Sequence, residues 1–250
     1  MAEVRAALVT GASYGIGAAT AIGLAEDGFD VAVTDLTTAP LASTVAAIEA
    51  FGQRAVALAL DLTDQASVER ALADAVGGLG QLDVLVNNAG APSLGKPAIE
   101  VTRAAWDGVI AVNLTGTFFM SRQMGRYLIE AGRPGAVISL ASTHGAVGFP
   151  GASAYGIAKA GVAHMTRMLA IEWAPHSIRV NAVAPGTTPT ESRAPGLKDP
   201  ARRAVMIERI PLKRFAEVDE VAGAIRYLAS PLAAYITGQT LLVDGGLTAY

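Results

Sequence analysis

The feature that most constrains this chain is a regular alternation of short strand-like and longer helix-like segments along almost its whole length. Apolar, β-branched runs predict strands at Ala6–Thr10, Asp30–Thr34, Ala55–Leu60, Leu82–Asn87, Ala136–Leu140, Ile178–Val183 and Thr240–Val243. Longer patterns between them predict helices at Ile16–Glu26, Leu41–Phe51, Ala66–Val76, about Arg103–Glu130, about Ala154–Trp173 and Val218–Leu228. Strands and helices that alternate at this spacing form βαβ crossovers, which build a parallel sheet with helices on both faces.

The composition is consistent with one such unit. Of the 250 residues, 52% are hydrophobic and 16% are charged, which suits a sheet that is buried on both faces. The strand segments are nearly all apolar, and no linker, internal repeat or low-complexity tract divides the chain. We therefore expect an α/β fold, a single doubly wound domain of Rossmann type that spans residues 1–250.

Other counts exclude several functional classes. The chain has no cysteine, which excludes disulfides, thiolate nucleophiles and cysteine-ligated metals. The three histidines, His144, His164 and His176, are scattered, so we expect no metal site. The net charge of −3 gives no reason to propose nucleic acid or an anionic membrane as a partner. Residues 1–5 show no signal-peptide pattern, and no apolar run approaches the ~18 residues of a membrane span, so we expect a cytoplasmic protein.

The alternation breaks after the strand that ends at Val183. Residues 184–211 contain five prolines and mixed charge, and they are too many for an ordinary connection. We expect a substrate loop here, which closes over bound cofactor and substrate. Its arginines Arg193, Arg202 and Arg203 are candidates to receive a substrate carboxylate, although solvated charge is the commoner role of such residues.

A glycine-rich turn connects the first strand to the first helix. Its glycines allow positive φ angles and close approach of a ligand, and the helix behind them presents free N–H groups. The full G-x-G-x-x-G pattern fails, because Thr20 stands where the last glycine is expected. The place of this turn in the fold still favours a pyrophosphate site over an empty tight turn. The residues assigned to that site are Gly11, Ser13, Tyr14, Gly15, Ile16 and Gly17.

An acidic residue ends the second strand. Asp35 stands 18 residues after Gly17, close to the ~20 typical of the carboxylate that binds the adenosine ribose. Such a carboxylate accepts hydrogen bonds from both ribose hydroxyls and repels a 2′-phosphate. No basic residue follows within several positions, and position 14 holds Tyr14. We therefore expect NAD, with NADP less favoured; a helix N-cap is the alternative role for Asp35.

Two further strand ends supply candidate cofactor contacts. Asp61 and Leu62 follow the third strand, where they would meet the adenine ring; N-capping of the next helix is the alternative for Asp61. Asn88, Ala89 and Gly90 follow the fourth strand, where they would line the cofactor floor or satisfy a turn.

Tyr155 and Lys159 lie four residues apart at the start of a predicted helix and therefore share one face. An ammonium near a phenol favours the phenolate and lowers the phenol pKa from ~10 towards working pH. A poised phenolate can accept the proton of an alcohol while hydride leaves the carbon, or return it in the reverse reaction. Such pairs also arise by chance, so this one is weak evidence when taken alone.

Two polar residues accompany this pair. Ser142 follows the fifth strand, 13 residues before Tyr155, where it can hold the substrate oxygen or cap a turn. Asn113 lies inside an apolar helical stretch, where its side chain competes with the backbone. Such local violations often mark functional sites, and Asn113 could hold a water that relays protons to the lysine. A core amide that is satisfied by the backbone is the alternative.

Together, these motifs resemble the classical short-chain dehydrogenases/reductases. The resemblance rests on Thr10-Gly11-(x)3-Gly15-Ile16-Gly17, Asn87-Asn88-Ala89-Gly90, Asn113, Ser142, Tyr155-(x)3-Lys159 and Pro185-Gly186, and it extends to Gly246. It implies a seven-stranded sheet in the order 3-2-1-4-5-6-7, and a homotetramer packed across the helices that carry Asn113 and Tyr155 and across the last strand. It implies Tyr155 as general acid/base and Lys159 as its modulator and nicotinamide-ribose ligand. It also implies that Ser142 polarises the substrate oxygen and that Asn113 anchors a relay water.

The chain departs from the family pattern at two positions. Thr188 stands where the family usually has Ile or Val, in the segment where Pro185, Gly186, Thr188 and Thr190 are expected to contact the nicotinamide. Tyr14 replaces the Arg that is common in NADPH-dependent 3-oxoacyl-carrier-protein reductases of the family. The second departure weighs against a role in fatty-acid synthesis.

The sequence therefore predicts an NAD(H)-dependent oxidoreductase that interconverts a secondary alcohol (a small polyol, sugar, cyclic or aryl alcohol) and its ketone. The main alternative is an NADPH-dependent carbonyl reductase, such as a 3-oxoacyl-[acyl-carrier-protein] reductase. A non-catalytic nucleotide-binding protein is a remote alternative, because such a protein would have lost part of the tetrad. The expected substrate pocket is lined by Ser142, His144, Phe149 and Gly186, and the identity of the substrate is left open.

Overall fold

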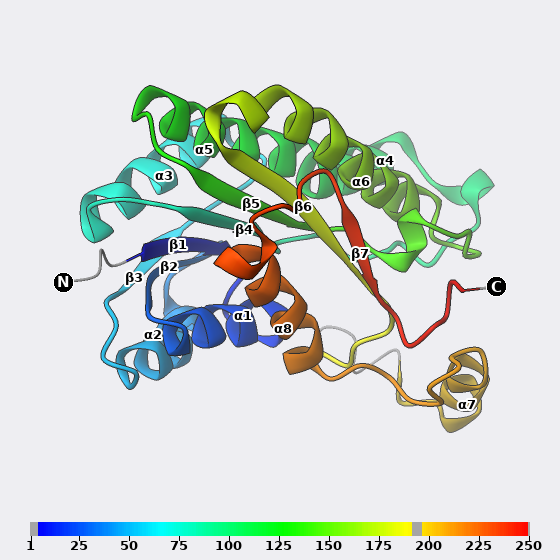
Figure 1. Cartoon of the computed structure of the whole chain (residues 1–250). Coiled ribbons are helices and arrows are strands. Elements are labelled where there is room, and N and C mark those ends of the chain that lie inside the picture. Colours follow the sequence, from blue (N-terminus) through cyan, green and yellow to red (C-terminus); the bar gives the residue numbers. More distant parts are fainter. Residues whose placement is uncertain (1–4, 192–196, 250) are drawn as a thin grey trace.

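A computed structural model describes residues 5–191 and 197–249. Its strands form one sheet in the order β3-β2-β1-β4-β5-β6-β7, which confirms the order that the family resemblance implies (Figure 1). Every neighbouring pair of strands is parallel. The strands are β1 (Arg5–Thr10), β2 (Phe29–Asp35), β3 (Ala55–Ala59), β4 (Val84–Asn87), β5 (Gly135–Leu140), β6 (Ile178–Pro185) and β7 (Thr240–Val243).

Helices cover both faces of the sheet (Figure 1). One layer contains α3 (Gln65–Leu79), α4 (Arg103–Ile110), α5 (Thr117–Glu130) and α6 (Ser153–Trp173). The other layer contains α1 (Gly15–Glu26), α2 (Ala42–Glu49) and α8 (Val218–Ala229). Short helical turns connect them: η1 (Ala39–Leu41), η2 (Ala98–Glu100), η3 (Ala111–Gly116), η4 (Thr143–Gly145), η5 (Ala174–His176) and η7 (Pro231–Ala233).

The sheet divides the buried side chains into two cores. Within β1, Leu8 packs in the core under α3, α5 and α6, whereas its neighbour Val9 packs in the core under α1, α2 and α8. Both side chains have no solvent exposure. Each strand therefore needs apolar residues at successive positions, which is why the strand segments do not alternate between apolar and polar residues.

The strand order changes direction at β1. Strands β2 and β3 lie on one side of β1, and strands β4 to β7 lie on the other. In an open parallel sheet, ligands bind outside the carboxyl ends of the strands at such a switch point. Thr10 ends β1, Asn87 ends β4 and Leu140 ends β5. The predicted motifs that follow these strands are thereby brought to one edge of the sheet.

The helix predicted from about Arg103 to Glu130 contains an irregularity. Its middle, Ala111–Gly116, forms a π-helical turn between α4 and α5. Single π-helical turns inside α-helices are rare and occur frequently at functional sites. Here the turn contains Asn113.

The prediction that residues 184–211 form only a loop needs correction. Strand β6 continues to Pro185, and residues Pro200–Glu208 form a helix, α7. Asp199 caps this helix, and its side chain accepts a hydrogen bond from the Ala201 amide at 3.0 Å. None of the described side chains of α7 is buried, so the helix lacks the core-facing apolar stripe by which helices are recognised. An Asp-Pro pair at a helix start was the available signal.

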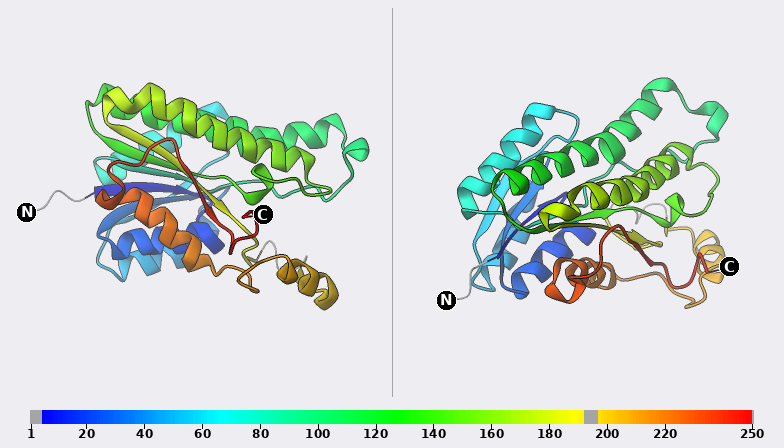
Figure 2. Two further views of the ribbon diagram at one scale, coloured as in Figure 1. Left: turned by 45° about the vertical axis from the view of Figure 1, so that its right-hand side comes forward. Right: turned by 45° about the horizontal axis from the view of Figure 1, so that its top comes forward.

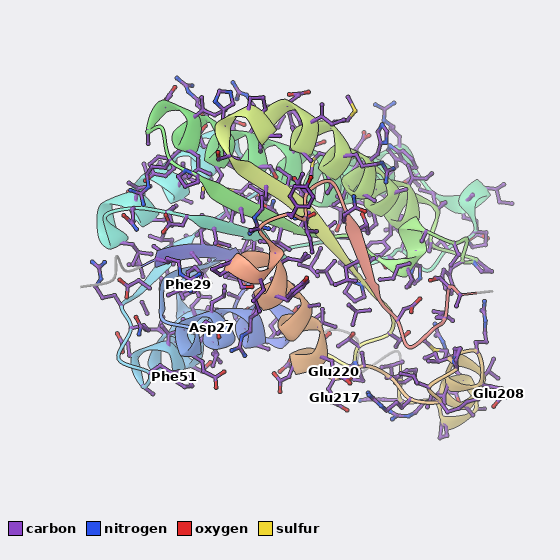
Figure 3. All side chains as sticks on the ribbon, viewed as in Figure 1. Asp27, Phe29, Phe51, Glu208, Glu217 and Glu220 are labelled. Carbon is purple, nitrogen blue, oxygen red and sulfur yellow. The ribbon has the colours of Figure 1, made fainter. Side chains whose placement is uncertain are left out.

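Helix α7 lies beyond the carboxyl ends of the strands, apart from both helical layers (Figures 1 and 2). Figure 3 shows Glu208 at its outer end. Within residues 5–191 and 197–249, no helix is both long and apolar enough to cross a membrane.

Candidate active site

A cavity of about 790 Å³ opens at the carboxyl edge of the sheet. All four predicted catalytic residues line it, as do all the predicted cofactor contacts except Gly17. Ser142 and Gly186 of the predicted substrate pocket also line it, whereas His144 and Phe149 stand beside it. The predicted residues that line the cavity are Gly11, Ser13, Tyr14, Gly15, Ile16, Asp35, Asp61, Leu62, Asn88, Ala89, Gly90, Asn113, Ser142, Tyr155, Lys159, Pro185, Gly186, Thr188 and Thr190.

The glycine-rich turn can exist only with glycine at its key positions. Gly11 and Gly15 have φ angles of 65° and 60°, which L side chains rarely adopt. Gly17 is not in the cavity wall, but a Cβ there would overlap the Gly11 carbonyl oxygen and the Asn88 amide. Helix α1 starts at Gly15, and no side chain among the described residues caps its first N–H groups. Those groups remain available to an anion.

Asn88 fixes the turn to the end of β4. Its Nδ2 donates to the carbonyl oxygens of Thr10 at 3.0 Å and Gly11 at 2.7 Å. In return, the Thr10 hydroxyl accepts hydrogen bonds from the backbone N–H groups of Asn88 and Ala89, both at 3.0 Å. Asn88 thus holds the glycine-rich turn in place through these bonds, and it also lines the cavity.

Asp35 is half-buried at the end of β2 and does not cap a helix. Its carboxylate accepts hydrogen bonds from the Ser13 hydroxyl and from the Leu36 amide at 2.8 Å. The N-cap alternative is therefore wrong for Asp35, because Thr38 precedes the next helical turn. The carboxylate joins the glycine-rich turn to the end of β2, and both lie in the cavity wall.

The N-cap alternative is also wrong for Asp61. Asp64 caps α3, with hydrogen bonds from the Ala66 and Ser67 amides. Asp61 is exposed, and its Oδ1 accepts bonds from the hydroxyl and the amide of Thr63, which hold the pKa of the carboxyl below its usual value. The neighbouring Leu62 is buried and provides an apolar part of the cavity wall.

The segment after β6 lies close to the glycine-rich turn. The Gly186 amide donates to the Val243 carbonyl at 2.9 Å, and a Cβ on Gly186 would lie 3.0 Å from the Cα of Asp244. Thr190 Cγ2 lies 2.9 Å from the position of a Cβ on Gly15.

Thr188 is 2% exposed, and its hydroxyl has no partner among the described residues. Compared with Val, Thr188 therefore places a buried hydroxyl where a second methyl group would be.

Lys159 is almost fully buried on α6. Its Nζ donates to the Leu140 carbonyl at the end of β5, at 2.6 Å. Burial lowers the pKa of Lys159 to about 8, because the low-dielectric interior disfavours the charged form. The same Nζ lies 5.7 Å from the centre of the Tyr155 ring.

Ser142 is in position for both of its predicted roles. It lines the cavity, and its hydroxyl also accepts a hydrogen bond from the His144 amide at 3.2 Å, which caps the turn η4. The His144 ring packs edge-on against Tyr155, with 5.7 Å between ring centres. Its Nδ1 lies 3.4 Å from the Ser142 hydroxyl oxygen.

Asn113 is fully buried in the π-helical turn. Its Nδ2 donates to the carbonyls of Ala91 at 3.0 Å and Val109 at 3.1 Å, so the backbone satisfies one half of the amide. The other half, Oδ1, has no partner among the described residues. A Cβ on Gly90 would lie 2.7 Å from this oxygen and 3.8 Å from Lys159 Nζ. A buried acceptor left open beside a lysine points towards a proton-handling site.

Several contributors were not predicted from the sequence. Ser93 lines the cavity, and its hydroxyl donates to the Gly151 carbonyl at 3.3 Å; a serine in a long loop carries no distinctive signal. Arg209 places its guanidinium carbon 5.4 Å from the centre of the Phe149 ring. Of the arginines proposed as carboxylate ligands, Arg202 and Arg203 are exposed on α7 and Arg193 lies outside the described residues.

The residues present fit a nicotinamide dinucleotide. The uncapped start of α1, the glycines without room for a Cβ and the open Asn113 oxygen are features that a ligand would explain. The start of α1 at Gly15 and the Asn113 side chain both line the cavity. Among the residues that the structure describes, no cluster of His, Asp or Glu could hold a metal ion.

Comparison with known proteins identifies the family. A family model described as enoyl-(acyl carrier protein) reductase matches residues 11–248. The chain is 45% identical to cis-4-hydroxycyclohexanecarboxylate dehydrogenase of Sinomonas cyclohexanicum, over 98% of this chain and 97% of that protein. It is 40% identical to L-rhamnose 1-dehydrogenase (NAD(P)(+)) of Sphingomonas sp., over 98% and 96% respectively.

A solved structure agrees in fold over the full length. Acetoin dehydrogenase from Enterobacter cloacae superposes with a TM-score of 0.90 at 35% identity, covering 100% of this chain and 97% of that one. Sheet order, motif positions and full-length similarity therefore agree, and the chain belongs to the classical short-chain dehydrogenase/reductase family of oxidoreductases.

Proposed function

We propose that this protein is an NAD(H)-dependent dehydrogenase that interconverts a small secondary alcohol and its ketone. One observation carries the proposal: Asn113, Ser142, Tyr155 and Lys159 meet in the same cavity as the glycine-rich turn and Asp35. A polyol, a sugar, or a cyclic or aryl alcohol is the substrate class. The names of the relatives, which include an alicyclic alcohol and a sugar dehydrogenase, support this class.

In this proposal, the side chains of the chain handle the proton. When bound, the nicotinamide supplies the hydride acceptor or donor. Ser142 holds the substrate oxygen, and the Tyr155 phenolate accepts the hydroxyl proton, or the phenol donates it to the ketone oxygen. The Lys159 ammonium stabilises the phenolate and binds the nicotinamide ribose. The open oxygen of Asn113 holds the water that carries the proton onwards from Lys159.

Asp35 supports NAD over NADP. A 2′-phosphate would face this carboxylate, and the exposed residues that follow, Leu36, Thr37 and Thr38, offer no positive charge. The alternative, an NADPH-dependent carbonyl reductase, is supported by the NAD(P)(+) in the name of one relative and by the reductase description of the family model. A comparison of kcat/KM with NAD⁺ and with NADP⁺ distinguishes the two proposals.

We also propose a homotetramer, in agreement with the family resemblance. Exposed apolar side chains on the elements concerned support it. They are Phe118 on α5, Ile157, Met168 and Ile171 on α6, Tyr227 on α8, Leu232 and Tyr235 shortly after α8, and Leu241 and Leu242 on β7. Light scattering tests this assembly, while the substrate loop at 184–211 and a cytoplasmic location stay predictions.

The test of function is NAD⁺ reduction across a panel of secondary alcohols, sugars and cyclic diols. Wild type and Tyr155→Phe are compared at equal concentration, with NADH fluorescence as the readout. We expect turnover of at least one secondary alcohol by wild type and its loss in the variant. Binding of NADH without turnover of any alcohol or ketone, with either NAD or NADP cofactors, would contradict the proposal.

A further inference from the structure

A buried row of hydrogen bonds runs along the start of α5, next to the π-helical turn. The Thr117 hydroxyl donates to the Asn113 carbonyl at 3.1 Å, and the Ser121 hydroxyl donates to the Thr117 carbonyl at 2.7 Å. From β4, the Nδ2 of Asn87 donates to the Ser121 hydroxyl at 2.8 Å and to the Ser139 hydroxyl of β5 at 3.2 Å. All five residues are at most 4% exposed. The row therefore ties α5 to two strands inside an otherwise apolar core.

Thr117 makes an unusual bond in this row. In a regular α-helix, the amide of residue 117 would donate to the carbonyl of residue 113, four positions earlier. Here the Thr117 amide donates to the Leu114 carbonyl instead, and the Thr117 hydroxyl takes its place at the Asn113 carbonyl. The hydroxyl thus replaces an amide bond that the π-helical turn lacks, so its removal should destabilise the turn.

Close packing makes the shape of this turn matter for the cavity. A Cβ on Gly116 would lie 2.6 Å from the Leu62 carbonyl oxygen, and Leu62 lines the cavity. The Asn113 Oδ1 and the Lys159 Nζ both lie beside Gly90, where a Cβ would meet them at 2.7 Å and 3.8 Å. A change in the turn rotates Asn113 about the helix axis and moves its Oδ1 away from Lys159.

We propose that Thr117 is a positioning residue for proton transfer, because its hydroxyl stabilises the π-helical turn and so holds the Asn113 Oδ1 beside Lys159. Ser121, which Asn87 holds in turn, fixes Thr117 through its carbonyl. Thr117 itself does not line the cavity, so its effect passes through Asn113. This inference rests on the proposed function, in which Asn113 holds the water that carries the proton onwards from Lys159.

The turn is tested first by amide hydrogen exchange, independently of turnover. Thr117→Val removes the hydroxyl and nearly preserves the side-chain volume. The amides of residues 111–117 should therefore exchange at least about tenfold faster relative to those of α6, because the local structure opens more often. Thr117→Ser keeps the hydroxyl and should show the relative exchange of the wild type.

Thr166→Val is the matched control. Thr166 is fully buried in α6, and its hydroxyl donates to the Val162 carbonyl at 2.9 Å within a regular helix. Its loss removes a similar hydrogen bond but should neither speed the relative exchange of residues 111–117 nor lower kcat. Ser121→Ala removes the bond that anchors the Thr117 carbonyl, and it should change both quantities in the same direction as Thr117→Val, by smaller factors.

Turnover is then measured in a double-mutant cycle with Asn113→Ala. Thr117→Val alone should lower kcat at least about tenfold and leave the KM for NAD⁺ within about twofold of the wild type, as suits a misplaced group at the reacting end. In the Asn113→Ala background the same substitution should lower kcat no further, because Thr117 acts through Asn113. A merely structural role would multiply the two losses. Thr117→Ser should restore most of the wild-type kcat.

The outcomes separate this inference from the proposed function. Unchanged relative exchange in Thr117→Val would overturn the inference, as would a wild-type kcat in that variant or losses that multiply across the cycle. If Thr117→Val does not fold, Ser121→Ala is carried through the same measurements, and no change in that variant would overturn the inference. Faster exchange that Thr117→Ser does not show, in a protein that turns over no alcohol, would retain the role of Thr117 in the turn and contradict the dehydrogenase proposal.

Discussion

The two ends of the cavity are built by different means. At the nucleotide end, between β1, α1 and β2, the surface is mostly backbone: two glycines with positive φ angles, the uncapped start of α1 and a third glycine without room for a Cβ. At the reacting end, between β5, η3 and α6, side chains form the site, and two of them are in unfavourable settings. Lys159 is a buried cation, and Asn113 interrupts a helix with one amide oxygen unpaired.

This difference predicts how each end responds to substitution. A backbone site is disrupted by added atoms, because the chain cannot move aside without losing its hydrogen bonds. A side-chain site is disrupted by removed atoms, and removal of an unfavourably placed group should also relieve strain. Substitutions at the nucleotide end should therefore lower both cofactor affinity and the stability of the protein. Substitutions at the reacting end should lower the activity but raise the stability.

The largest effect is expected at Tyr155. Tyr155→Phe removes one hydroxyl and no apolar volume, so kcat should fall by about 10²–10⁴-fold, the usual contribution of general acid–base catalysis. NADH affinity should stay nearly unchanged. Steady-state kinetics and NADH fluorescence titration measure the two quantities. Retention of more than about a tenth of the wild-type kcat would rule out Tyr155 as the proton-transfer group.

The next largest effect is expected at Gly17. The added Cβ of Gly17→Ala would overlap the Gly11 carbonyl and the Asn88 amide, so we expect NADH affinity to fall by more than about tenfold and stability by ~1–3 kcal/mol. Gly223→Ala is the matched control, because a Cβ there meets nothing within 4 Å among the described residues. This control lies inside α8 and should raise stability by ~0.5–1 kcal/mol. Similar NADH affinities in the two variants would contradict the backbone account.

A smaller effect of opposite sign is expected at Lys159. The folded-state pKa of about 8 lies below the ordinary 10.5, so the burial penalty is on the order of 3 kcal/mol at pH 7. Lys159→Met removes this penalty but leaves the Leu140 carbonyl without its donor, at a cost of ~1 kcal/mol. The variant should be inactive yet more stable by about 2 kcal/mol in denaturant unfolding.

The pH dependence has a defined sign. Below about pH 8 the lysine is charged in both the folded and the unfolded state, and the penalty is fully present. Between pH 8 and 10.5 the unfolded state binds more protons, so the contribution of Lys159 to stability becomes less unfavourable as the pH rises. This rise should be absent in Lys159→Met. Equal pH profiles for the two proteins would show that the lysine is not buried as a cation.

The sequence predicts the strands and the glycine-rich turn after β1 well, because both depend on local patterns. Apolar runs mark the strands, and glycines at fixed spacing mark the turn after β1. The strand order came from the family resemblance, since spacing alone does not bring β4, β5 and α6 to one edge. For Ser142 and Asn113 the residues themselves suggested both a catalytic and a structural role, and the resemblance favoured the catalytic one. The alternative N-cap roles of Asp35 and Asp61 could be rejected only from the structure.

Features that depend on tertiary contacts could not be predicted. Helix α7 buries none of its described side chains, so no apolar periodicity in the sequence predicts a helix there. The π-helical turn at Asn113 depends on how α4 and α5 pack over the sheet. Arg209 meets Phe149 from a segment 60 residues away, which no local motif encodes.

Cofactor choice tests the nucleotide end, and with it the NAD-linked function, most directly. Like charges 4 Å apart repel by roughly 4 kcal/mol at an effective dielectric constant of about 20, so a 2′-phosphate beside Asp35 should be disfavoured even after solvent screening. We predict that wild-type kcat/KM favours NAD⁺ over NADP⁺ by on the order of 10²-fold or more. Asp35→Ser combined with Leu36→Arg should narrow or reverse this ratio. A wild-type enzyme that prefers NADP⁺ would contradict the role of Asp35 and favour the carbonyl-reductase alternative.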